Sequence, residues 1–211
     1  MKSLLILLVL LSCTHRNQNL ADKLMFESTH EELIDKFEDP DRDQWQKPAW
    51  VLKQMGDIEG KKIIDIGSGS GYFSRKLHKK GANVTAADVD DKFLKHLRQF
   101  EGPGFTVKEI EFDDPKMNSH SFDMAFTSNT FHHIDHRVRY LKKVHKGLKA
   151  GGQLVIVDYK PSAGVADKTG PRNSIRVPIL KVVDELMKAG FGRVRLDQDT
   201  LPRQYLVIGI K

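Results

Sequence analysis

Cysteine is almost absent from this sequence, which has one among 211 residues. A single thiol excludes a disulfide framework and a cysteine-based zinc site within the chain. Long apolar runs are also absent, because the longest aliphatic stretch covers only the eight residues 4–11. Such a stretch spans about 12 Å as a helix, far less than the roughly 30 Å of a bilayer core, so it is too short for a transmembrane anchor.

The remaining composition is that of an ordinary globular domain. Hydrophobic residues make up 39% and charged residues 29%, which excludes a disordered chain, a coiled coil and a polytopic membrane protein. Basic residues exceed acidic ones by 34 to 28. They are spread along the chain apart from an amphipathic stretch at 137–148, so we expect a solvated helix face there, with contact to anionic lipid as the alternative. We expect no nucleic-acid partner.

The N-terminus has the pattern of an export signal. A positive start, the apolar run 4–11 and Ser12-Cys13 are typical of a secretory signal peptide. Leu10 to Cys13 also resembles the lipobox of bacterial lipoproteins, in which the cysteine is acylated and becomes the first mature residue. We therefore predict a signal peptide at 1–12, lipidation at Cys13, a tether at 13–22 and attachment to the membrane in the cell envelope. The alternative is a misassigned start or a leader that packs on the domain, which would leave the protein cytoplasmic.

From residue 23 onward, helical and strand-like patterns alternate, which predicts a single α/β domain at 23–211. Strands are expected at 61–66, 83–88, 105–110, 122–127, 153–159, 193–196 and 204–210. Helices are expected at 25–37, 48–55, 72–80, 92–100, 137–148 and 179–189. The polar stretch 38–47 is interpreted as a break, and Gly151-Gly152 as the end of the long basic helix.

A glycine-rich loop follows the first predicted strand. Asp65 to Gly71 reads D-I-G-S-G-S-G, and its backbone N–H groups can meet a ligand at a helix N-terminus. Asp88 ends the next strand, where an acid reaches the ribose hydroxyls of a bound nucleoside. Tyr72 stands where a dinucleotide fingerprint needs glycine or alanine, and no P-loop is present. Asp65 suits a ligand with a cationic amino group, and an alternative role for it is to order the loop.

Further motifs follow the later strands. They are S-F-D-M-A-F-T-S-N-T-F-H-H-I at 121–134, L-K-A-G-G-Q-L-V-I-V-D at 148–158 and M-K-A-G-F at 187–191. With the glycine loop, they resemble class I S-adenosylmethionine-dependent methyltransferases over about residues 40 to 211. The segment 42–48 is similar to one in a subgroup of small bacterial members. The resemblance implies a Rossmann-like, seven-stranded, mostly parallel sheet with an antiparallel last strand and helices on both faces.

The resemblance also implies a set of contacts with S-adenosylmethionine. The methionine part would face Gly67, Gly69 and Gly71, with Ser68 in the same loop. The ribose would face Asp88, with Val89 beside it. The adenine amine would face Glu111 or Asp113, and the methyl group would lie near Asn129. Asn129 to Phe131 does not match the pattern of enzymes that methylate amino groups of DNA bases. We therefore expect a small acceptor, for which the resemblance to quinone-biosynthesis methyltransferases makes a lipophilic, quinone-like molecule one candidate.

Two histidines follow the fourth predicted strand. His132 or His133 is a candidate general base, needed only if the acceptor must lose a proton, and packing or backbone hydrogen bonding is the alternative role. We expect no metal site there, a mobile lid at 161–178 and a monomer. A lipoprotein that keeps this fold as a binding module without turnover is the alternative function. A nicotinamide oxidoreductase is a third, which Tyr72 disfavours.

Overall fold

The computed structural model describes residues 29–161 and 170–211. Its centre is a seven-stranded sheet in the order β3-β2-β1-β4-β5-β7-β6. The strands are β1 (Lys62–Ile66), β2 (Asn83–Asp88), β3 (Phe105–Glu109), β4 (Phe122–Ser128), β5 (Leu148–Tyr159), β6 (Arg193–Asp197) and β7 (Gln204–Ile210). Strand β7 runs antiparallel to β5 and β6, and the pairs from β3 to β5 are parallel. The predicted fold class is thereby confirmed.

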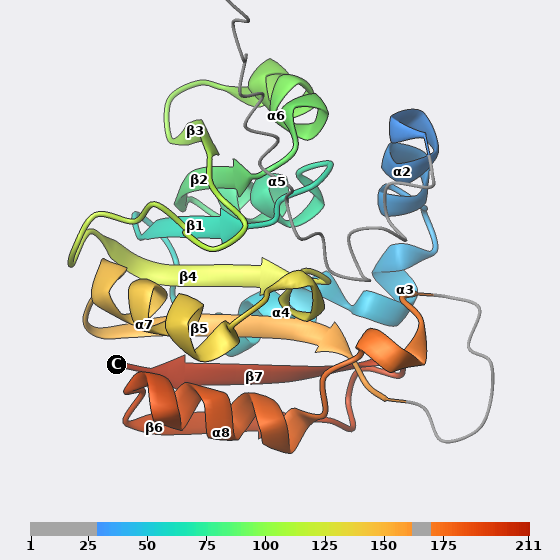
Figure 1. Cartoon of the computed structure of the whole chain (residues 1–211). Coiled ribbons are helices and arrows are strands. Elements are labelled where there is room, and N and C mark those ends of the chain that lie inside the picture. The colour runs from blue at the N-terminus through green and yellow to red at the C-terminus, as the bar shows by residue number, and fades with distance from the viewer. Residues whose placement is uncertain (1–28, 162–169) are drawn as a thin grey trace, which may run out of the picture.

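Helices cover both faces of the sheet (Figure 1). They are α2 (His30–Phe37), α3 (Arg42–Gln46), α4 (Pro48–Met55), α5 (Tyr72–Lys79), α6 (Asp91–Leu97), α7 (Arg137–Gly147) and α8 (Ile179–Ala189), with short 3₁₀ turns η1 (Arg98–Phe100), η2 (Phe131–His133) and η3 (Asn173–Ile175). Apolar residues of α4 and α5 join the core on one face, and those of α7 and α8 join the core on the other.

The two cores follow from the alternation of side chains along buried strands. In β1, Ile63 belongs to one core and Ile64 to the other, and neither exposes any surface. A strand buried on both faces reads as a continuous aliphatic run, as β1 does. This burial fixes the register of β1 between β2 and β4, because a slip of one residue would exchange the two faces.

The position of β1 also determines where a ligand can bind. The chain leaves β1 toward β2 on one side and later returns to β4 on the other, so the strand order reverses at β1. Open α/β sheets bind ligands in the crevice at the carboxyl ends of the strands beside such a reversal. Figure 1 shows α3 beside this edge, near the arrowhead of β4.

Two local predictions were wrong. The helix predicted at 137–148 ends at Gly147, and Leu148 to Gly152 already belong to β5, so Gly151-Gly152 does not end it. A Cβ on Gly147 would lie 2.7 Å from Met117 Cε, so close packing explains the glycine that ends the helix. The segment 38–47 contains α3, which the polar composition concealed.

Several predictions fall outside the described residues: the signal peptide, the tether, Cys13 and the part of the lid at 162–169. No helix within the two described ranges is long and apolar enough to cross a bilayer.

Candidate active site

The glycine loop joins β1 to α5 and is tied to the end of β2 by backbone bonds. The N–H groups of Gly67 and Ser68 both donate to Ala87 O, at 2.8 and 3.0 Å. Gly67 has a φ of 73°, and a Cβ there would lie 2.8 Å from Thr130 Cβ and closer still to its Oγ1 and Cγ2 atoms. Only glycine therefore allows the loop after β1 to approach the loop after β4 this closely.

Ser68 has a structural role. Its hydroxyl donates to Asp65 O at 2.8 Å and accepts from Ala87 N at 2.9 Å, which links the ends of β1 and β2. The side chain and the backbone N–H of Ser68 both hold the end of β2, and its predicted contact with the cofactor stays a prediction.

Asp88 lies buried at the end of β2 and joins the glycine loop to the following turn. Its carboxylate accepts from Gly69 N at 2.8 Å, Val89 N at 2.8 Å and Asp90 N at 3.1 Å. Burial raises the pKa of Asp88, and these three backbone bonds act in the opposite direction. A carboxylate offers about four acceptor positions, so one is left for a ligand hydroxyl.

Asp65 lies beneath the loop, buried at the end of β1. Its carboxylate accepts from Ser74 Oγ of α5 at 2.5 Å. Burial raises the pKa of Asp65 to about 7, the Ser74 bond lowers it, and Asp88 raises it further. Two buried carboxyl groups beside one loop suit a ligand that brings positive charge and hydroxyl groups, and they disfavour a pyrophosphate.

Residues 64–156 match the family described as a methyltransferase domain. Over this range, which is less than half of the chain, the protein is similar to a methyltransferase domain, and its fold is that of S-adenosylmethionine-dependent methyltransferases. The glycine cradle and the two acids fit S-adenosylmethionine, whose amino group and sulfonium are cationic.

The structure resembles an S-adenosylmethionine-dependent methyltransferase from Aquifex aeolicus, with a TM-score of 0.74, 23% identity, and coverage of 87% of this chain and 98% of that one. It also resembles phosphoethanolamine N-methyltransferase 2 of Haemonchus contortus, solved in complex with S-adenosylmethionine. The TM-score is 0.64 at 20% identity, and the match covers 74% of this chain and 39% of that one.

Curated relatives match about half of the chain. A ubiquinone biosynthesis O-methyltransferase of Pseudomonas aeruginosa is 29% identical over 112 residues, which is 51% of this chain and 47% of the relative. A tRNA U34 carboxymethyltransferase of Saccharophagus degradans is 27% identical over 112 residues, which is 50% of this chain and 34% of the relative. The chain thus spans half or less of the length of these relatives.

The two acids predicted near adenine form ion pairs with two different cations. Glu111 pairs with Lys116 at 2.9 Å, whereas Asp113 pairs with Arg139 of α7 at 3.0 Å. Both carboxylates are mostly exposed. Their roles in binding adenine stay predictions.

The two predicted histidines lie in η2, after β4. The ring of His132 is buried, with 3% of the side chain exposed, and its Nδ1 lies 2.8 Å from Asp158 Oδ1 of β5. The other carboxylate oxygen of Asp158 accepts from His132 N at 3.0 Å. The ring of His133 is stacked obliquely on His132, with centroids 4.3 Å apart. Asp158 thus orients His132, and no local pattern predicts this relation because the two residues lie far apart in the chain.

Asn129, predicted near the methyl group, directly follows β4 and has a φ of 59°. Its Oδ1 accepts from Gln204 Nε2 of β7. Gln46 Nε2 of α3 donates to Gln204 Oε1 at 2.9 Å and to Ser128 Oγ at 3.0 Å. Neither Gln46 nor Gln204 was predicted as a site residue, because the two lie far apart in the chain and meet only in the folded structure.

The segment 30–46, here called the cover segment, lies across the glycine loop. A Cβ on Gly69 would lie 3.2 Å from the ring of Phe37. Glu38 accepts from Ser70 Oγ and from Arg75 Nη2, both at 2.6 Å. Polar side chains therefore hold the cover segment over the loop.

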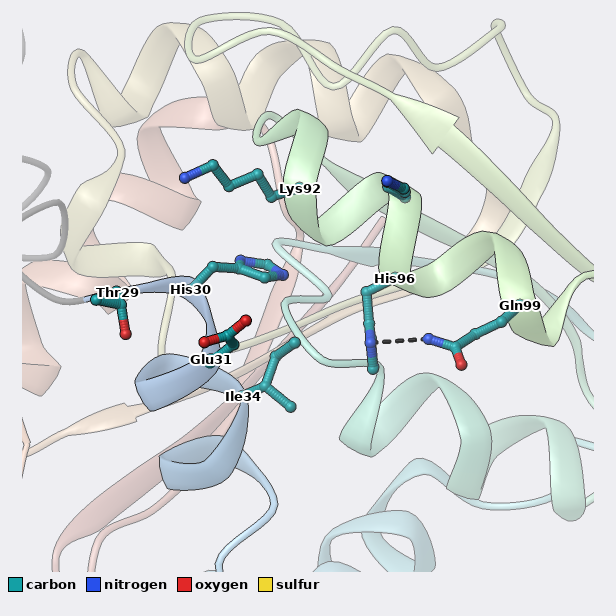
Figure 2. A pocket seen from close by; sticks show the side chains of 8 residues that line it. Thr29, His30, Glu31, Ile34, Lys92, His96 and Gln99 are labelled. Atoms are coloured by element: carbon teal, nitrogen blue, oxygen red, sulfur yellow. Dashed lines mark hydrogen bonds between the residues drawn. The ribbon is translucent and has the colours of Figure 1, made fainter.

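A separate cavity of about 580 Å³ lies between α2 and α6 (Figure 2). Its lining residues are Thr29, His30, Glu31, Ile34, Lys92, Lys95, His96 and Gln99. Beside it, the ring of Phe93 contacts the rings of His30 and Phe37, with centroids 4.5 and 5.8 Å apart. This end of the cover segment thus rests on α6.

Proposed function

We propose that this protein transfers a methyl group from S-adenosylmethionine to a small acceptor. The observation that carries the proposal is the junction of Asp88 with the glycine loop, through the 2.8 Å bond from Gly69 N. This junction joins a buried acid to the glycine loop at the carboxyl ends of the strands, the point where α/β sheets bind nucleosides.

The chain's own residues would act chiefly by positioning. Bound S-adenosylmethionine supplies an already activated methyl group, so holding donor and acceptor in line can provide most of the acceleration. In this proposal Asp88 binds the ribose hydroxyls, the glycine loop and Asp65 bind the methionine part, and Asn129 borders the position of transfer.

Calorimetry of the full chain tests the proposal. We expect binding of S-adenosylmethionine and S-adenosylhomocysteine, and none of NAD. Asp88→Asn should weaken binding of both by about 1–3 kcal/mol, because one partner of a buried hydrogen bond is altered. Exposed Asp91→Asn is the matched control and should leave binding unchanged. If the wild-type chain binds neither methyl ligand, the proposal is wrong, and NAD binding would favour an oxidoreductase.

The acceptor we propose is a lipophilic molecule with an aromatic ring, such as a quinone precursor. Trp45 of α3 and Tyr159 at the end of β5 have ring centroids 6.2 Å apart, which provides apolar surface at the same sheet edge. The names of two relatives point the same way: the ubiquinone biosynthesis enzyme, and a phthiotriol/phenolphthiotriol dimycocerosates methyltransferase of Mycobacterium leprae. Radiolabelled methyl transfer to quinone precursors, with tRNA as the competing substrate class, would distinguish the candidates.

We propose His132 as the proton acceptor where the acceptor must lose a proton. With Nδ1 facing Asp158, the lone pair of a neutral ring lies on Nε2, the arrangement that orients a histidine base. Because the ring is buried, the acceptor would have to lie against η2. His132→Gln should lower kcat by about 100-fold with unchanged cofactor affinity; a parallel loss of cofactor affinity would instead indicate a packing role.

The lipid anchor at Cys13 is a further proposal, supported by the order of residues 1–13. Growth with labelled palmitate should label the wild-type chain and leave Cys13→Ala unlabelled. Labelling that persists in the variant contradicts the anchor. An unlabelled wild-type chain that stays in the cytoplasm would support the alternative of a leader without an export role.

A further inference from the structure

Arg42 of the cover segment is a buried cation that has no carboxylate partner among the described residues. It exposes 7% of its surface. Its Nε donates to Gln46 Oε1 and its Nη1 to Phe37 O, both at 2.5 Å. A guanidinium has five N–H donors, so three remain, and none of them has an acceptor within the described part of the chain. No described Asp or Glu lies within ion-pair distance.

The remaining donors can be reached by an anion, because none of the guanidinium nitrogens is a fully buried atom without a partner. Burying an unpaired charge costs several kcal/mol, and protein ions that are buried are almost always paired. Burial lowers the pKa of Arg42, and among the groups that raise it are Glu38 and Asp65. The guanidinium also stacks on Tyr72, its carbon 3.9 Å from the ring centroid, so its position is fixed by packing.

The surroundings of Arg42 indicate which kind of anion fits there. Tyr72 is the first residue of α5, directly after Gly71, and Phe37, whose carbonyl accepts from Arg42, contacts the glycine loop at Gly69. Arg42 therefore lies next to the loop, and its charge interacts with that of Asp65. A cation and a carboxyl group beside one loop match the two charges of an α-amino acid, with its ammonium toward Asp65 and its carboxylate toward Arg42.

We propose that Arg42 binds the carboxylate of the methionine part of the cofactor and that Gln46 positions Arg42 for this contact. The inference rests on the proposed function and adds to it the residue through which the cover segment recognises the ligand. Gln46 is fully buried and bonded to Ser128 and Gln204, so it connects Arg42 to the ends of β4 and β7. Arginine suits the role because its planar fork can donate two parallel bonds to one carboxylate.

The test compares two ligands that differ only in the carboxylate. The full chain is titrated with S-adenosylhomocysteine and with its decarboxylated analogue, which keeps the amine, the sulfur and the nucleoside. Arg42→Met should weaken binding of S-adenosylhomocysteine by about 10- to 100-fold, as expected for a charge-assisted bond. Binding of the decarboxylated analogue should change less than about threefold, and exposed Arg98→Met, the matched control, should bind both ligands like the wild type.

A second variant keeps the test decisive if Arg42→Met folds poorly. Gln46→Leu retains the guanidinium and removes the group that orients it. It should therefore weaken binding of S-adenosylhomocysteine by a smaller factor than Arg42→Met does, and leave binding of the decarboxylated analogue unchanged. Equal weakening of both ligands in both variants would overturn the proposal, because Arg42 would then only hold the cover segment in place. Unchanged affinity for S-adenosylhomocysteine would overturn it as well. A wild-type chain that binds neither ligand would instead refute the proposed function itself.

Discussion

The glycine loop and the cover segment enclose the same site but are held by different forces. The loop is tied by backbone bonds to Ala87 and lies between two apolar cores. In the cover segment, α2 buries no residue, and the two buried residues of α3 are the polar Arg42 and Gln46. Side-chain polar bonds connect it to the loop.

This difference predicts different stabilities. Segments with few buried apolar contacts open locally at a lower free energy than core strands. The loop should therefore unfold only with the whole domain, whereas the cover segment should open on its own and be stabilised by ligand through Arg42. The largest effects are then expected in the loop and the smallest in the cover segment.

Gly67→Ala should have the largest effect. The new Cβ collides with Thr130, and the φ of 73° disfavours any side chain, so we expect a loss of about 2–4 kcal/mol in the free energy of unfolding together with loss of cofactor binding. Urea denaturation and calorimetry measure both. Gly192→Ala is the matched control, because a Cβ there meets nothing within 4 Å. A stable, ligand-binding Gly67→Ala would show that the two loops are not in close contact.

Asp65→Asn should change how stability depends on pH. The folded pKa of about 7 lies above the unfolded value of about 4, so the folded state binds more protons between these values. Its stabilising contribution is full below about pH 4 and is lost as pH rises toward 7 and above. Urea midpoints measured from pH 4 to pH 8 should thus fall less steeply in Asp65→Asn than in the wild type. A parallel pair of curves would contradict the raised pKa.

The same carboxyl group gives a ligand-linked signal. A cationic amino group near Asp65 favours its ionised form, so binding S-adenosylhomocysteine near pH 6 should release protons. Calorimetry in buffers of different ionisation enthalpy measures this release, which should be smaller in Asp65→Asn. Equal release in both chains would place the amino group elsewhere.

The contrast between the two regions also explains what the sequence could predict. The strands and the glycine loop are encoded locally: Ile63 and Ile64 each fill one core, and the glycines mark positive φ angles. The site around Arg42 and Gln204 is not, because its contacts join residues that lie far apart in the chain. Arg42 and Gln46 are four residues apart, as neighbours on one helix face are, but the polar composition of 38–47 favoured a break over a helix.

Glu38→Ala should have the smallest effect. Its bonds to Ser70 and Arg75 are partly exposed, so their loss should cost about 0.5–1 kcal/mol and act on the cover segment alone. Amide exchange in α2 should then rise by about two- to fivefold, while the thermal midpoint and exchange in β1 stay as in the wild type. Asp35→Ala, on the exposed side of the same helix, is the control. S-adenosylhomocysteine should suppress the added exchange if Arg42 holds its carboxylate, because ligand and Glu38 stabilise the same closed segment. Faster exchange in β1 as well would mean that the cover segment and the core unfold together.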